Sequence, residues 1–313
     1  MNINTVPSIK EIHIEPTSVC NAECPMCARN VGGKRLNPYI TLKSLPVKWF
    51  YDNIKPNTIK QLNKIFFCGN VGDPASAPEL IQISKYFKEH NPNITVGLNT
   101  NGGLKTKDWW KQLGNVLQGH LDYCVFSIDG LEDTNHIYRK NVRWQKIIEN
   151  AEAFISTGAS AHWDMLVFEH NKHQVEEAKE LATEMGFTWF RSKETDRWDT
   201  YTQNLGIRPA EEYKLQTYTS TSNIVCEKDR DNSVFLDYTG KFWPCCHMAE
   251  AYLNKIGWEL HNDIRDYNND ELFKEYKIRL TTETPFYVCR RTCGVKHGKR
   301  TQWKTEEPLN TKT

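Results

Sequence analysis

The chain has 313 residues, of which 39% are hydrophobic and 25% are charged, and this composition is typical of a globular protein with one large and one smaller domain. The formal net charge of +1 argues against a general affinity for nucleic acid or acidic membranes, no apolar run approaches a membrane span, and the N-terminus lacks a secretion signal. Ten cysteines without such a signal favour metal ligation over disulfide bonds, so we expect a cytoplasmic protein.

Short strands and amphipathic helices alternate along most of the chain. We expect strands over residues 11–15, 64–68, 94–98, 123–128, 162–168 and 187–190, and helices over residues 43–53, 77–90, 106–117, 144–157, 173–185 and 209–218. This alternation predicts an α/β fold with a parallel sheet and right-handed crossovers. Six such units favour a partial barrel over a closed eight-stranded one. A ligand is then expected at the C-terminal ends of the strands.

A cysteine loop follows the first predicted strand and has the spacing C-x3-C-x2-C. Its members are Cys20, Cys24 and Cys27, whose thiolates are soft ligands that suit zinc or iron–sulfur clusters. A structural zinc site normally has four protein ligands, so three thiolates favour a centre with one open position. The spacing alone also allows a zinc loop with a distant fourth ligand, or simply buried cysteines.

Residues 14–19 before this loop, Met26 just before its third cysteine, and the following Ala28-Arg29 make the segment resemble the radical S-adenosylmethionine (SAM) superfamily. The resemblance implies a [4Fe-4S] cluster on the three cysteines, with its open iron chelated by the amino and carboxylate groups of SAM. It also implies a (β/α)6 partial TIM-like barrel over about residues 8–218. An external electron donor such as flavodoxin or ferredoxin would reduce the cluster.

Further strand-end motifs fit the same resemblance. The turn over residues 69–73 resembles the "GGE" motif that binds the SAM amino group, although its acid is displaced to Asp73, and an ordinary turn is the alternative. Asn99 and Asn101 follow the third strand, where amides could reach ribose hydroxyls or merely stabilise a turn. The expected SAM contacts in these two segments are Gly69, Asn70, Gly72, Asp73, Asn99 and Asn101.

The fourth strand ends in Ser127-Ile-Asp129-Gly130, and Tyr138-Arg139 follows. This run resembles the "S-x-D-G…YR" pattern of SPASM-type relatives, in which the serine and arginine hold the SAM carboxylate. The planar fork of Arg139 suits bidentate binding of a carboxylate. We expect Asp129 to cap the local turn, and the backbone at Val167, after the fifth strand, to contact the adenine.

Residues 219–300 contain a second set of cysteines around a predicted β-hairpin over residues 234–243. The members are Cys226, Cys245, Cys289 and Cys293, and four thiolates could equally bind structural zinc. The spacing C-x13-G-x4-C resembles the SPASM/twitch extension, which implies one auxiliary [4Fe-4S] cluster on these four. We therefore divide the chain into a barrel (1–218), a small cluster-binding domain (219–300) and a loose polar tail (301–313).

The chemistry that the resemblance implies is cleavage of SAM to a 5′-deoxyadenosyl radical, which takes a hydrogen atom from the substrate. An auxiliary cluster fits an electron acceptor, so we expect dehydrogenation or cross-linking of a small molecule or peptide side chain. A redox-neutral epimerisation or rearrangement is the second hypothesis, in which Cys246 could supply hydrogen or act as a base. A non-catalytic zinc module that binds RNA or protein is the third, although the sequence lacks a basic patch with interleaved aromatics.

Overall fold

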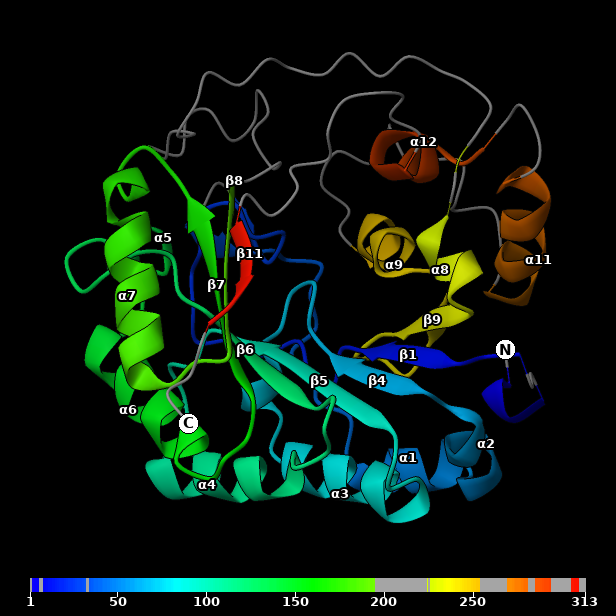
Figure 1. Cartoon of the computed structure of the whole chain (residues 1–313). Coiled ribbons are helices and arrows are strands. Elements are labelled where there is room, and N and C mark those ends of the chain that lie inside the picture. The colour runs from blue at the N-terminus through cyan, green and yellow to red at the C-terminus, as the bar shows by residue number, and fades with distance from the viewer. Residues whose placement is uncertain are drawn as a thin grey trace.

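The computed structural model describes residues 2–5, 8–31, 34–194, 224, 226–253, 269–280, 285–293 and 305–309. In this part of the chain a nine-stranded sheet has the order β10-β9-β1-β4-β5-β6-β7-β8-β11 (Figure 1). Its strands are β1 (Glu11–Ile14), β4 (Lys64–Phe67), β5 (Thr95–Thr100), β6 (Tyr123–Ser127), β7 (Ala161–Val167), β8 (Trp189–Glu194), β9 (Ser233–Leu236), β10 (Phe242–Trp243) and β11 (Thr305–Pro308). A separate antiparallel pair, β2 (Asn30–Val31) and β3 (Arg35–Leu36), follows the cysteine loop.

Strands β1, β4, β5, β6, β7 and β8 are the six predicted strands, and each pairs in parallel with the next. The predicted α/β class and partial-barrel architecture are confirmed. Alternate residues of β1 explain why it forms: Ile12 and Ile14 are fully buried, while Glu11 and His13 on the other face are only half-buried. The C-terminal ends of these strands all lie at one edge, as the candidate site requires.

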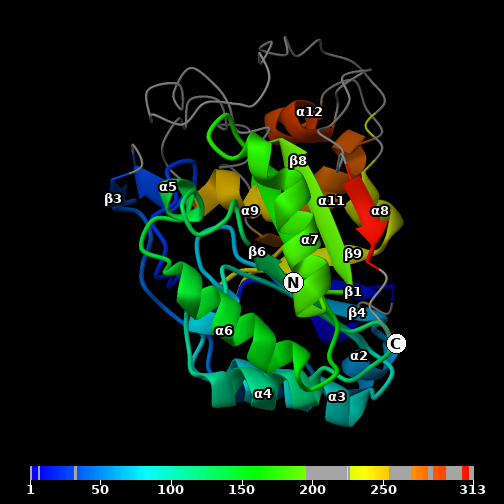
Figure 2. The ribbon, with the colours of Figure 1, turned by 60° about the vertical axis from the view of Figure 1, so that its left-hand side comes forward.

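Helices connect the strands and cover one face of the sheet. They are α1 (Val47–Asn53), α2 (Pro56–Gln61), α3 (Leu80–His90), α4 (Lys107–Val116), α5 (Asn135–Tyr138), α6 (Trp144–Ile155) and α7 (Val175–Met185), with short 3-10 turns η1 (Ile3–Thr5), η2 (Pro74–Ser76) and η3 (Lys172–Gln174). Figure 2 shows α3, α4 and α6 along the same side of the molecule. In α4 the buried Trp110 and Leu113 face the core, and the hydroxyl of Thr106 caps the first turn by accepting from Trp109 N.

The first helix is shorter than the sequence predicts. The predicted helix 43–53 begins only at Val47, because Thr17 and Ser44 form a β-bridge and Ser18 N donates to Lys43 O, which keeps residues 43–45 extended. Pro46 then occupies the N-cap with an extended backbone. The predicted helix 209–218 lies outside the described residues.

The predicted hairpin is present as β9 and β10, which pair antiparallel. It does not form a sheet of its own, because β9 also pairs in parallel with β1, with Ile12 opposite Val234. Residues 305–308 were expected in a loose tail; instead they form β11 and pair antiparallel with β8. Neither pairing could be predicted from local sequence patterns, because the paired strands lie more than one hundred residues apart along the chain.

The remaining helices lie above β9 in the view of Figure 1, and α12 is the farthest from that strand. They are α8 (Glu227–Arg230), α9 (Cys246–Leu253), α11 (Asn269–Leu280) and α12 (Tyr287–Cys293). They enclose a second apolar cluster that includes Trp243, Met248, Leu272 and Phe286. The described helices include none that is both long and apolar enough to cross a membrane.

Candidate active site

The cysteine loop lies at the end of β1 and is held by backbone hydrogen bonds. Cys27 N donates to Cys24 O at 3.1 Å, and the side-chain amide of Asn30 donates to the same carbonyl at 3.1 Å. Burial raises the pKa of the Cys24 thiol to about 11, and the neighbouring Cys27 raises it further while Arg139 opposes the rise. Burial also raises the pKa of Cys20, with contributions from Asp73 and from the other two cysteines. The three thiols are therefore close enough to raise one another's pKa.

This environment fits a metal cluster. Crowded, desolvated thiols do not ionise readily by themselves, whereas a bound metal centre supplies the positive charge that stabilises thiolates. Within the described residues no three His, Cys, Asp or Glu side chains converge closely enough to hold a single metal ion. A cubane binds each thiolate through a different iron, so its ligands need not approach one another as closely as those of one ion do.

Glu15, the residue that follows β1, fixes the turn over residues 69–73 by hydrogen bonds. One oxygen of the Glu15 carboxyl accepts from Val71 N at 2.7 Å and from Gly72 N at 3.1 Å, and its other oxygen has no partner among the described residues. Burial raises the pKa of Glu15 to about 8. A Cβ on Gly72 would lie 1.8 Å from Thr17 O, so only glycine fits this approach to the cysteine loop. Sequence reasoning missed Glu15, although its place between the strand and the loop was a signal.

Asp73 ties this turn to the end of β5. Its carboxylate oxygens accept from Ala75 N at 2.9 Å, from the Thr100 hydroxyl at 2.9 Å and from Asn101 N at 2.7 Å. With both oxygens engaged inside the protein, Asp73 positions the neighbouring segments. Burial raises its pKa, and these hydrogen bonds oppose the rise.

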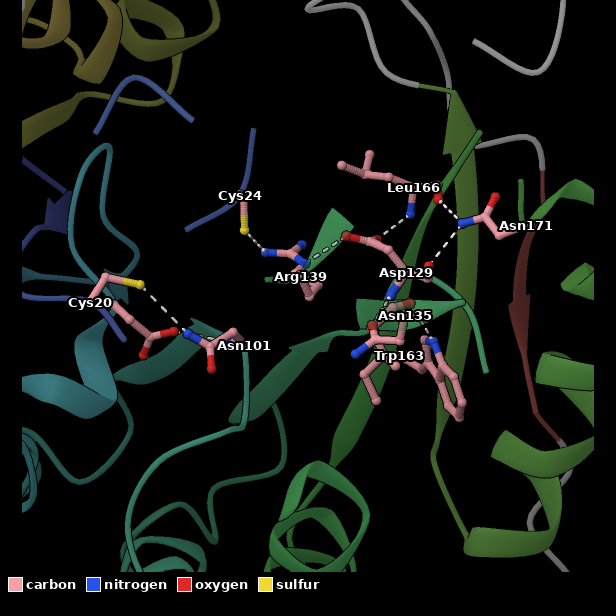
Figure 3. Close-up of polar contacts among 11 residues, drawn as sticks. Cys20, Cys24, Asn101, Asp129, Asn135, Arg139, Trp163, Leu166 and Asn171 are labelled. Atoms are coloured by element: carbon pink, nitrogen blue, oxygen red, sulfur yellow. Dashed lines mark hydrogen bonds and ion pairs between the residues drawn. The ribbon is translucent and has the colours of Figure 1, made fainter. Parts of the chain in front are cut away.

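The two predicted asparagines differ in their surroundings. Asn101 lies against the cysteine loop, where its amide donates to Asn21 at 2.9 Å and approaches the Cys20 sulfur at 3.7 Å (Figure 3). Asn99 Oδ1 is buried and has no partner among the described residues. A buried amide oxygen in that state can accept from a ligand hydroxyl.

Arg139 is brought next to the cysteine loop by a buried ion pair with Asp129. Its Nε donates to Asp129 at 2.6 Å, and its Nη1 lies 3.9 Å from the Cys24 sulfur (Figure 3). The other oxygen of Asp129 accepts from Leu166 N at 2.6 Å, and Asn171 donates to the Asp129 carbonyl at 2.9 Å. Asp129 was expected to cap a local turn, but it joins the ends of β6 and β7 and orients Arg139. Burial raises the pKa of Asp129, and the adjacent Arg139 opposes that rise.

Ser127 and Val167 complete the predicted positions. Each is the last residue of its strand, β6 and β7 respectively, and Ser127 is half-buried while Val167 is buried. Both lie at the edge of the sheet that also holds Asn99 and Arg139. The structure therefore brings the predicted SAM contacts to one edge of the sheet, around the cysteine loop.

We expect Asp129→Asn to weaken SAM binding about tenfold, equal to ~1.4 kcal/mol. The change removes the charge that orients Arg139, and breaking a buried ion pair also costs about 3–5 kcal/mol of stability. Isothermal titration of the reconstituted enzyme with SAM measures the effect. Asp122→Asn is the matched control, because Asp122 forms an ion pair of similar burial with Lys88 at 2.6 Å but lies before β6, at the other end of that strand from Asp129. Equal loss of SAM affinity in both variants would contradict the positioning role.

The second cysteine set gathers around the C-terminal helices. Cys226 precedes α8, Cys245 precedes α9, and Cys289 and Cys293 lie on α12. Burial raises the pKa of Cys245 well above its usual range, and Cys246, Cys289 and Cys293 raise it further. The hydroxyl of Tyr276, on α11, lies 2.7 Å from the Cys226 sulfur. Burial raises the pKa of Tyr276, and Cys226 and Cys245 contribute to the rise. The four predicted ligands thus share one neighbourhood.

Asn70 lies between the two cysteine sets. Its side-chain amide donates to Cys246 O at 2.9 Å, while Cys27 Sγ lies 3.9 Å from Asn70 O. Burial raises the pKa of the Cys246 thiol to about 11, Glu250 raises it further, and Lys228 opposes the rise. A single turn after β4 therefore contacts both the cysteine loop and the start of α9.

The chain is similar to known proteins in sequence and in fold. The sequence profile of the Radical SAM superfamily matches residues 14–182, which is 169 of 313 residues. A search of curated proteins found no match. Streptococcus suis SuiB bound to S-adenosylmethionine is similar in fold, with a TM-score of 0.57, 15% identity, and coverage of 91% of this chain and 68% of SuiB.

SuiB bound to its precursor peptide SuiA gives a TM-score of 0.58 at 15% identity, over 91% of this chain and 67% of that one. Native anSMEcpe with bound AdoMet gives a TM-score of 0.54 at 16% identity, over 90% of this chain and 89% of that one. At such low identity these likenesses concern the fold. The matched profile covers more than half of the sequence, and the chain therefore belongs to the radical SAM superfamily, whose members use a [4Fe-4S] cluster and SAM, as the cysteine loop predicts.

Proposed function

We propose that this chain is an oxidative radical SAM enzyme that dehydrogenates or cross-links a small molecule or a peptide side chain. The observation that carries the proposal is the second thiol neighbourhood of Cys226, Cys245, Cys289 and Cys293, which adjoins the first through Asn70. An auxiliary [4Fe-4S] cluster held by these four residues would have no open iron for SAM, so electron transfer is the role that fits it. Net oxidation of a substrate needs such an acceptor.

The first site would hold its cluster on Cys20, Cys24 and Cys27. When bound, this cluster and SAM supply a 5′-deoxyadenosyl radical for hydrogen abstraction, and the auxiliary cluster supplies a one-electron acceptor. Arg139, which Asp129 orients beside the cysteine loop, would bind the SAM carboxylate. The backbone of the 69–73 turn, which Glu15 fixes, would bind the SAM amino group.

The remaining SAM contacts would come from the strand ends. Asn99 has a buried amide oxygen without a partner among the described residues, which suits a ribose hydroxyl. Ser127 at the end of β6 would join Arg139 at the carboxylate, and the backbone of Val167 at the end of β7 would meet the adenine. The family requires a one-electron donor, for which we propose flavodoxin or ferredoxin. A peptide is among the proposed substrates because SuiB, which shares this fold, was solved with its precursor peptide SuiA.

Iron and sulfide analysis after anaerobic reconstitution tests the proposal. Two clusters require about eight iron atoms per chain. A screen of metabolites and co-expressed peptides should then reveal a SAM-dependent loss of two hydrogens from the substrate. Zinc at the second thiol set, or a product with unchanged mass, would contradict an oxidative enzyme with an auxiliary cluster.

We expect Tyr276→Phe to lower the reduction potential of the auxiliary cluster by about 59 mV, which is tenfold in the reduced-to-oxidised ratio. A phenol is protonated at neutral pH and can donate to the Cys226 sulfur, and such hydrogen bonds stabilise the more negative, reduced cluster. A redox titration followed by electron paramagnetic resonance measures the shift. Tyr86→Phe is the control, because it removes a hydroxyl that donates to Ile54 O at the same 2.7 Å but on α3. An unchanged potential with an intact cluster would exclude this role.

A redox-neutral reaction is the second candidate. It is supported by the position of Cys246, whose backbone carbonyl accepts from Asn70 at 2.9 Å in the turn that also contacts the cysteine loop. A thiol is mostly protonated at neutral pH and can give a hydrogen atom to a substrate radical. The resulting thiyl radical would then take an electron from the external donor and a proton from solvent. We expect Cys246→Ala to retain SAM cleavage and to slow product formation. Solvent deuterium at a substrate carbon would favour epimerisation, whereas an unchanged yield would exclude Cys246 from the reaction.

A further inference from the structure

The segment that follows the cysteine loop has an unusual charge distribution. No aspartate or glutamate occurs from Cys24 to Tyr51, whereas Arg29, Lys34, Arg35, Lys43 and Lys48 all fall in this stretch. The whole chain is nearly neutral at +1, so positive charge is concentrated in this stretch, although Lys48 is paired with Asp52 at 2.8 Å.

Most of this charge lies on the surface, together with apolar side chains. Lys34, Arg35 and Lys43 are exposed, and so are Leu36, Tyr39 and Leu42, with exposed fractions of 37%, 51% and 56%. We call these six residues the 34–43 surface. Isolated apolar residues are common on protein surfaces. Three exposed apolar residues grouped with three cationic residues and no acidic one are typical of a protein-binding site.

The 34–43 surface is fixed to the flanks of the cysteine loop. Asn37 N donates to Arg29 O at 2.8 Å, and the Ser18 hydroxyl donates to Thr41 O at 2.7 Å. Ser18 N also donates to Lys43 O at 2.9 Å. In Figure 2, β3, which carries Arg35 and Leu36, lies at the left side of the molecule, well above α3 and α4. A partner on this surface would lie close to the flanks of the loop that carries the half-buried Cys27.

We propose that the 34–43 surface docks an acidic one-electron carrier protein, of which flavodoxin is the probe. This proposal rests on the function proposed above, because it assigns the electron donor of the same cysteine loop. Three exposed cations steer an acidic partner, and complementary charge mainly accelerates encounter. Leu36, Tyr39 and Leu42 would supply the apolar contact that a charged patch alone lacks. The carrier gives one electron to the cluster and is itself oxidised by one electron.

The test compares two reductants on the same reconstituted enzyme. Formation of 5′-deoxyadenosine is followed with reduced flavodoxin below saturation, and separately with photoreduced 5-deazariboflavin, a small molecule that needs no docking surface. We expect the combined variant Lys34→Glu, Arg35→Glu and Lys43→Glu to lose at least about tenfold in the flavodoxin-driven rate, because steering of this kind changes association rates by 10–10³. The deazariboflavin-driven rate should stay within twofold.

Salt gives a second measurement. Raising ionic strength from 0.1 M to 1 M shortens the Debye length from about 10 Å to about 3 Å, so the flavodoxin-driven rate of the unmodified enzyme should fall. The triple variant should no longer show that decline. If charge reversal disturbs folding, the neutralising variant Lys34→Gln, Arg35→Gln and Lys43→Gln should show the same selective loss to a smaller degree.

Charge reversal at Lys60, Lys85 and Lys111, which are exposed on α2, α3 and α4, is the matched control and should leave both rates unchanged. Equal loss with both reductants, or an unchanged flavodoxin-driven rate, would overturn the docking proposal. The latter result would point to another anionic partner, such as an acidic substrate peptide. Absence of 5′-deoxyadenosine with either reductant in the unmodified enzyme would instead contradict the proposed function. Direct measurement of flavodoxin binding would then still decide the docking question.

Discussion

Replacing Cys20, Cys24 and Cys27 together with alanine is expected to abolish formation of 5′-deoxyadenosine. The three thiols are the proposed ligands of the cluster that meets SAM, and they lie on one loop after β1. The second thiol set lies on other elements, so the variant should keep about four of eight iron atoms. Product chromatography and iron analysis measure the two outcomes on one preparation.

Cys124→Ala is the control for this triple variant. Cys124 is fully buried in β6 and belongs to neither thiol set, so its loss should leave both the iron content and SAM cleavage intact. Formation of 5′-deoxyadenosine by the triple variant would disprove the assignment of the cluster ligands.

Alanine at Cys226 or Cys293 is expected to separate SAM cleavage from substrate turnover. The auxiliary cluster is proposed to accept the substrate's electron after the first hydrogen abstraction. The variants should therefore still make 5′-deoxyadenosine, but the product should fall below about one hundredth of normal, which corresponds to more than ~2.7 kcal/mol on the barrier. Mass spectrometry of the substrate pool measures the second quantity.

Loss of a metal site can also unfold the surrounding structure, so the thermal midpoint of each variant must be compared with that of Cys124→Ala. A folded variant with normal product yield would show that the second thiol set is dispensable. In that case the redox-neutral alternative would gain support, because epimerisation needs no net electron acceptor.

Elements that depend on a local sequence pattern could be predicted from the sequence. The predicted strand 162–168 is β7, Ala161–Val167, and α7 ends at Gly186 in a left-handed conformation with φ of 86°, as the glycine indicates. Hydrophobic periodicity and a turn residue suffice for such elements. Each of these motifs follows a strand of a parallel sheet, so the sequence also predicts that they lie at the same edge of the sheet.

Contacts between distant segments could not be predicted in the same way. Glu15 supports a turn more than fifty residues later, and Asp129 binds a backbone amide on the next strand as well as Arg139. Both are buried carboxyl groups whose partners only the fold brings together. Their places just after β1 and β6 mark both as residues at strand ends, but the local sequence does not identify the partners that they bind.

The parallel pairing of β1 with β9 has a consequence for the order in which the molecule can be built. Glu11 pairs with Ser233, and these residues are 222 positions apart in the sequence. Until the ribosome has delivered β9, β1 has an open edge, and such an edge invites association with other chains. Contacts of this separation also form slowly. The cysteine loop is therefore synthesised about two hundred residues before the strand that covers the edge of β1. We expect stable cluster insertion to follow synthesis of β9, and shortened forms that lack residues 226–253 to aggregate during expression.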